Sequence, residues 1–184
     1  QIVRAGSEPV AQVAGILNGE YEWSRRENHR FSSMIDLLEI RMREEIREAA
    51  GGTYGVGVYG VRWRRPQERY AVQFAFGCDP DQVEPLTALA FDLLEGTTTT
   101  APSEDELTRI KAQQQESYDN SRQQNGYWLG NMVFAVEHGR TFNSILDYPD
   151  LIESLTAEEI RSVADRYLNS PNRGTVTLLP EEDE

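Results

Sequence analysis

The stretch IRMREEIREAAGGTYGVGVYGVRW, from Ile40 to Trp63, contains the end of one predicted helix and the whole of one predicted strand. It completes an apolar repeat at steps of three and four residues, which predicts an amphipathic helix over residues 28–50. The repeat comprises Phe31, Met34, Ile35, Leu38, Met42 and Ile46. Gly51-Gly52 ends the helix, because glycine adopts the left-handed C-cap conformation at little cost. The alternation that follows predicts a strand over residues 53–63.

Other segments predict the rest of an α+β fold. Strands are predicted at 12–17, 69–77 and 175–179, and helices at 79–96, 103–118, 127–137 and 156–168, with a loop at 97–102. Ser103–Glu106 and Thr156–Glu159 have the spacing of capping boxes. We therefore expect residues 1–184 to form a single domain, with an antiparallel or mixed sheet of about four strands covered by about five helices.

Composition limits the class of protein. The net charge of −13 argues against nucleic acid as a partner, because phosphate binding needs a cationic surface. A hydrophobic fraction of 39% is too high for a disordered chain, and no apolar run is long enough to span a membrane. Lys111 is the one lysine beside seventeen arginines, which suggests a salt-adapted or GC-rich source. The chain begins at Gln1 without a signal-like segment, so we expect a fragment or a processed product.

No complete catalytic or metal-binding set is visible in the sequence. His29 and His138 are far apart, and neither belongs to an HxxEH or HExxH spacing. Cys78 has no partner for a disulfide or a multi-cysteine zinc site. Carboxylate pairs such as Glu44-Glu45 are typical of a solvated acidic surface. We therefore expect no metal, no cofactor and no complete catalytic site in this chain.

Several segments, read in order, resemble the C-terminal domain of the pitrilysin/insulysin family of zinc peptidases, and most closely its PqqL-like bacterial branch. They are Gly6-Ser7-Glu8-Pro9, Gly19-Glu20-Tyr21, the stretch from Ile40 to Val58, SEDELTRIKAQQ from Ser103, and YPDLIESLTAEEIRSVADRYL from Tyr148. The resemblance covers nearly the whole chain. It implies the fold of the LuxS and mitochondrial-processing-peptidase type of metallohydrolase domain.

The resemblance also implies a place in a larger enzyme. Members of this family are clamshells of four related domains, in which an HxxEH motif in the first domain and a distal glutamate hold zinc. This chain has no HxxEH and is similar to the fourth, last domain. The implied partners are a peptide substrate and either the other domains of the polypeptide or a zinc-bearing companion subunit. Zinc is expected in the N-terminal half of the parent, this chain alone is expected to be inactive, and the branch suggests periplasmic or exported location.

Two residues carry the implied substrate contacts. In the family an arginine on the long helix and a tyrosine at the start of the next strand support the tetrahedral intermediate, and they match Arg41 and Tyr54 here. A guanidinium and a phenolic hydroxyl suit a developing oxyanion. The interval between them is wider than usual in the family, which leaves Arg43 as a competitor for Arg41.

Structural roles are the alternatives for both residues. Arg41 could form a surface ion pair with Glu44 or Glu45, and Tyr54 could be a sheet residue half covered by a helix. The alternative for the whole chain is a catalytically dead scaffold or partner-binding module derived from the same family.

Overall fold

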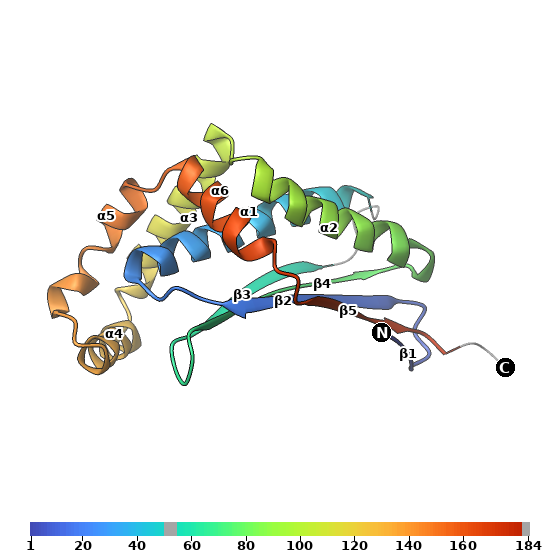
Figure 1. The fold of residues 1–184 in the computed structure, drawn as a ribbon, viewed down its shortest axis with the longest axis horizontal. Coiled ribbons are helices and arrows are strands. Elements are labelled where there is room, and N and C mark those ends of the chain that lie inside the picture. Colours follow the sequence, from blue (N-terminus) through green and yellow to red (C-terminus); the bar gives the residue numbers. More distant parts are fainter. Residues whose placement is uncertain (50–54, 182–184) are drawn as a thin grey trace. The chain divides into compact units, whose positions relative to one another are not determined.

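A computed structural model describes residues 1–49 and 55–181, and its strands form one mixed sheet (Figure 1). The described strands are β1 (Ile2–Arg4), β2 (Ala11–Glu20), β3 (Val56–Trp63), β4 (Arg69–Cys78) and β5 (Arg173–Leu179). Their order across the sheet is β1-β5-β2-β4-β3. β1 pairs with β5 in parallel, and the other neighbours are antiparallel. The strands predicted at 53–63 and 69–77 are therefore confirmed over β3 and β4, which form an antiparallel hairpin.

The described helices are α1 (Arg25–Ala49), α2 (Val83–Thr99), α3 (Glu104–Ser121), α4 (Asn125–Glu137), α5 (Tyr148–Glu153) and α6 (Ala157–Leu168). Two short 3-10 helices, η1 (Pro80–Gln82) and η2 (Phe142–Ile145), complete the described elements. The chain divides into two compact units, residues 1–102 with 158–184, and residues 103–157. The α+β class and the helix-covered mixed sheet are confirmed, with one more strand and one more α-helix than expected.

In the first unit, α1, α2 and α6 cover one face of the sheet (Figure 1). The alternation of β2 places Ala11, Val13 and Leu17 in the core, and the predicted stripe of α1 is buried against the same face. Phe74 and Phe76 of β4 also point into this core. The other face, which we call the open face, has no helix of the first unit on it among the residues that the structure describes (Figure 1).

Close backbone approach occurs at a glycine of β3. A Cβ at Gly60 would lie 2.6 Å from Ile35 Cγ1 and 2.7 Å from Phe31 Cε1. The approaching element is α1 of the same chain, so this glycine serves internal packing.

Two differences from the expected boundaries have local causes. β1 was not predicted, because three exposed residues carry no alternation and depend on pairing with β5. The expected loop at 97–102 is wrong for its first three residues, since α2 continues to Thr99. There the Thr97 hydroxyl donates to Leu93 O at 2.7 Å and the Thr98 hydroxyl to Glu95 O at 2.8 Å, which stabilises the last turn.

The second unit comprises α3, α4, η2 and α5. α3 begins with the predicted capping box, in which Ser103 and Glu106 each bond the other's backbone N–H. The Tyr118 ring of α3 packs against Tyr127 and Tyr148, with centroids 6.1 and 5.7 Å away. Lys111 Nζ donates to Glu153 O at 2.9 Å, which links α3 to α5. η2 and α5 were not predicted.

Candidate functional site

Arg41 contacts the C-terminal end of α2. Its Nη1 donates to Thr97 Oγ1 at 3.2 Å and to Thr100 O at 3.3 Å, and its Nη2 donates to Ala101 O at 3.4 Å. The last carbonyls of a helix lack intrahelical partners and carry partial negative charge, so a cation is stabilised there. The structure therefore gives Arg41 a fixed position between α1 and the end of α2.

Arg43 and Tyr54 are placed differently. Arg43 is exposed and forms an ion pair with Glu39, one turn earlier in α1. A guanidinium so exposed can be displaced readily, because a surface ion pair contributes little. Tyr54 lies outside the described residues, within the segment 50–54. The proximity of Arg41 and Tyr54 therefore stays a prediction.

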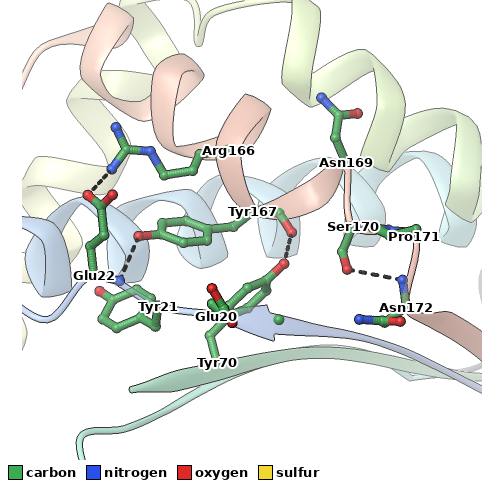
Figure 2. A pocket seen from close by; sticks show the side chains of 11 residues that line it. Glu20, Tyr21, Glu22, Tyr70, Arg166, Tyr167, Asn169, Ser170, Pro171 and Asn172 are labelled. Carbon is green, nitrogen blue, oxygen red and sulfur yellow. Dashed lines mark hydrogen bonds and ion pairs between the residues drawn. The ribbon is translucent and has the colours of Figure 1, made fainter. Parts of the chain in front are cut away.

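A polar pocket lies in the first unit where β2 and α6 end and β4 begins (Figure 2). It has a volume of about 440 Å³. Its lining residues are Gly19, Glu20, Tyr21, Glu22, Tyr70, Arg166, Tyr167, Asn169, Ser170, Pro171 and Asn172. Gly19 is required there, because a Cβ would lie 2.8 Å from Cε1 of Tyr70 on the paired strand.

Three buried tyrosines form the floor of this pocket and use their hydroxyls internally. The Tyr70 hydroxyl donates to Tyr167 O at 2.6 Å (Figure 2). The Tyr167 hydroxyl donates to Glu27 Oε1 at 3.0 Å. The Tyr21 hydroxyl donates to Asn28 Oδ1 at 2.9 Å. The Tyr167 ring centroid lies 5.1 Å from that of Tyr21 and 4.9 Å from that of Tyr70.

The carboxylate below the tyrosines is buried and ion-paired. Glu27 is 6% exposed and lies 3.3 Å from Arg166 Nη1 and 3.5 Å from Arg30 Nη1. Arg166 also pairs with Glu22 at 2.5 Å, at the mouth of the pocket. The charges of this network are thus compensated within α1, α6 and the connection before α1.

Burial keeps the three phenols protonated. Desolvation, followed by the nearby Glu27 carboxylate, raises the pKa of Tyr167 to about 12. Burial also raises the pKa of Tyr21 and that of Tyr70 above the usual value near 10. Each hydroxyl is therefore a hydrogen-bond donor at neutral pH, and the network is suited to holding α6 on the sheet.

Metal-ligating residues do not cluster in the described parts of the chain. Among residues 1–49 and 55–181, no group of three or more His, Cys, Asp or Glu side chains could hold a metal ion. His29 is buried in α1, and His138 stacks on Phe134 with ring centroids 4.0 Å apart. Burial, followed by the nearby Asp79, raises the pKa of the Cys78 thiol. Within the same ranges, no helix has the length and apolar character needed to cross a bilayer.

Comparisons with known proteins identify relatives over most of the chain. Residues 2–114 match the family described as the peptidase M16 inactive domain. PqqL of Escherichia coli strain K12, described as a probable zinc protease, is 26% identical over 199 aligned positions. The match covers 97% of this chain and 19% of PqqL. The chain therefore spans about a fifth of the length of this curated relative.

Solved structures have the same fold. The crystal structure of the periplasmic protease PqqL from Escherichia coli superposes with a TM-score of 0.84 and 23% identity, over 98% of this chain and 20% of that one. An inactive peptidase domain from Bordetella parapertussis superposes with a TM-score of 0.74 and 18% identity, over 98% of this chain and 95% of that one. Because the family match spans more than half of the sequence, this chain belongs to the peptidase M16 inactive-domain family of zinc proteases.

Proposed function

We propose that this chain is the noncatalytic C-terminal domain of a zinc metalloendopeptidase, where it helps to enclose the chamber and contacts the peptide opposite the zinc-bearing domain. The match of residues 2–114 to the inactive-domain family carries the proposal. The similarity to about a fifth of PqqL supports a parent of several domains. Zinc, held in the N-terminal half of the parent, would supply the Lewis acid for peptide hydrolysis.

Arg41 is the better placed of the two candidate arginines. Acceptors at the end of α2 orient its guanidinium, whereas Arg43 is exposed and paired with Glu39. A fixed guanidinium suits a transition-state contact, because its position is set before the substrate binds. The bonds of 3.2–3.4 Å are long, so they can be exchanged in part for a substrate carbonyl.

Steady-state kinetics of the full-length parent test the assignment. Tyr54→Phe should lower kcat by about 10- to 1000-fold with little change in KM, as expected for loss of a donor that acts in the transition state. Arg41→Lys should lower kcat/KM, because lysine cannot reproduce the planar fork of the guanidinium. The same change at Arg47, exposed on the same helix, is the matched control.

The outcomes separate a substrate role from a structural role. If Arg41→Lys lowers Tm and leaves kcat/KM unchanged, Arg41 only holds α2. If Arg43→Lys lowers kcat/KM and Arg41→Lys does not, Arg43 makes the substrate contact in place of Arg41. Unchanged turnover in Tyr54→Phe would contradict its role as a donor.

Zinc content separates the peptidase from a scaffold. The full-length parent should contain stoichiometric zinc and an HxxEH motif, whereas the 184-residue chain alone should bind none and cleave nothing. A parent and companion subunit that both lack HxxEH would favour the inactive scaffold. The periplasmic location described for PqqL supports export of the parent, which fractionation of the source cells would test.

A further inference from the structure

A cavity lies on the open face of the sheet, beside the turn that joins β3 to β4, and all of its lining residues belong to the first unit. It has a volume of about 520 Å³. Pockets for small ligands typically have volumes of about 300–1,000 Å³. The β3–β4 turn dips to the side of the sheet opposite α1, α2 and α6 (Figure 1). The turn therefore adds a wall to this face of the sheet.

The floor of the cavity is formed by strand residues whose side chains point away from the core. Tyr70 and Val72 of β4 are buried on the covered face, so Ala71 between them lies on the open face. Ala71 is nevertheless only 3% exposed, which means that neighbouring side chains on the open face cover it. Ile16 of β2 lies on the same face, because Leu17 beside it is in the core. The floor of the cavity is therefore apolar.

An indole and two guanidinium groups line the cavity above this floor. Arg62 donates to Asn28 O of α1 on the covered face, so the next residue, Trp63, lies on the open face, where it is 46% exposed. Trp63 is the cross-strand partner of Arg69, so the two side chains share this face and begin about 5 Å apart. Arg65 of the turn is the second cationic residue of the lining.

Both arginines are available to an anionic ligand. Neither Arg65 nor Arg69 forms an ion pair with another residue that the structure describes. This includes Glu20 of β2, which is the other cross-strand neighbour of Arg69 on the open face. The lining contains no aspartate or glutamate, although the whole chain has a net charge of −13. The cavity is thus a positively charged site in an acidic chain, and its charge is complementary to a carboxylate.

We propose that this cavity binds the C-terminal residue of a peptide whose last side chain is aromatic or branched aliphatic. The free carboxylate contacts the guanidinium groups of Arg65 and Arg69, because arginine donates two parallel hydrogen bonds to a carboxylate. The last side chain packs against the Trp63 ring and the apolar floor. This inference rests on the proposed function, which supplies a peptide as the ligand.

The arrangement of cationic and apolar groups favours a peptide terminus over an acidic side chain. In a C-terminal residue the carboxylate and the side chain are bonded to the same Cα, which matches an arginine and an indole on directly paired residues. In the interior of an extended peptide adjacent side chains point in opposite directions, so an acidic residue and its apolar neighbour cannot both enter the cavity. Asn18 and Gln67 also line the cavity, and their amide groups can bond the last peptide unit.

Fluorescence anisotropy tests the proposal by titrating a labelled peptide with the 184-residue chain. The peptide is a short run of glycine and serine that carries the label at its N-terminus and ends in phenylalanine. It is prepared once with a free C-terminal carboxylate and once as the C-terminal amide. The free acid should bind with a Kd below about 1 mM. The amide should bind about 10-fold or more weakly, because it lacks the charge that the arginines contact.

Variants of the lining residues test where the peptide binds. Arg69→Gln and Trp63→Ala should each weaken binding of the free acid about 10-fold. Both side chains are exposed, so neither variant should unfold, which an unchanged Tm would verify. Arg64→Gln is the matched control, because Arg64 is an exposed arginine of the same turn that does not line the cavity. This control removes the same charge and should bind the free acid as wild type does.

Three outcomes would overturn the proposal. The first is absence of binding of the free acid at chain concentrations up to about 1 mM. The second is equal affinity for the free acid and the amide, since the arginines would then not contact the carboxylate. The third is equally tight binding of an amidated peptide with an internal aspartate, since the site would then take acidic side chains. The assay needs neither zinc nor turnover, so its failure would leave the proposed function to the kinetics of the Arg41 and Tyr54 variants.

Discussion

The covered and open faces of the sheet share the same strands and the same backbone hydrogen bonds, but their side chains differ. On the covered face, Phe74 and Val58 are buried, whereas Tyr59 and Val61 of the open face are exposed. The covered face also carries the tyrosine network that joins β4 to α6. The difference shows that in one unit of this chain stability resides on one side of the sheet, which leaves the other side available for binding.

The largest expected effect is a cavity under the covered face. Phe74 is 1% exposed, and its ring packs against Phe91 with centroids 5.7 Å apart. Phe74→Ala should lower the free energy of unfolding by about 3–5 kcal/mol, measured by urea denaturation. The neighbouring Gln73 points to the open face, so Gln73→Ala should change it by less than about 0.5 kcal/mol. Equal losses at both positions would contradict the asymmetry.

Glycines of β3 give a second comparison of the two faces. Gly60→Ala would place a Cβ 2.6 Å from Ile35 Cγ1 in the core and should cost about 1–3 kcal/mol of unfolding free energy, because the core must move. Gly57→Ala would meet only the Tyr59 ring, 2.8 Å away at its hydroxyl and free to move because Tyr59 is exposed. The Gly57 variant should therefore be nearly neutral by the same measurement. A larger loss at Gly57 than at Gly60 would show that the open face is packed.

The sequence predicted elements whose side chains follow one periodicity over many residues. The stripe of α1 and the alternation of β3 predicted both elements to within a few residues of their described bounds. β1 was missed because three residues are too few for a pattern. The end of α2 was missed because hydroxyl groups of consecutive threonines stabilise it, although threonine normally favours other conformations.

The site was less predictable than the fold. Tyr21, Tyr70 and Tyr167 meet only because the β2–β4 register and the position of α6 bring together residues up to 146 positions apart, and neither is encoded in a local motif. Glu27 could not be singled out in the sequence, because the chain contains many acidic residues and most of these are expected to be exposed to solvent. The substrate role of Arg41 and Tyr54 came from the family resemblance and stays a prediction.

A smaller loss of unfolding free energy is expected at high pH, where the buried tyrosines of the pocket lose their protons. The pKa of Tyr167 is raised to about 12 in the folded state, so its contribution to stability is complete below the unfolded value near 10 and is lost as the pH rises towards 12. The unfolding free energy should fall over this range by at most about 1.4 kcal/mol per pH unit for this group.

Removal of the hydroxyl isolates this contribution. Tyr167→Phe should be less stable at pH 8, because Glu27 loses a hydrogen bond, and its stability should fall less steeply above pH 10. Tyr21 and Tyr70, whose pKa values are also raised, account for the slope that remains. An identical slope in wild type and variant would show that Tyr167 does not titrate with folding.

The smallest effect is expected for isosteric changes on the open face. Val61→Thr and Val176→Thr keep the β-branched shape at two exposed positions, so each should alter the unfolding free energy by less than about 0.5 kcal/mol in dilute solution. A loss above about 1 kcal/mol in urea denaturation would mean that this face is part of the core.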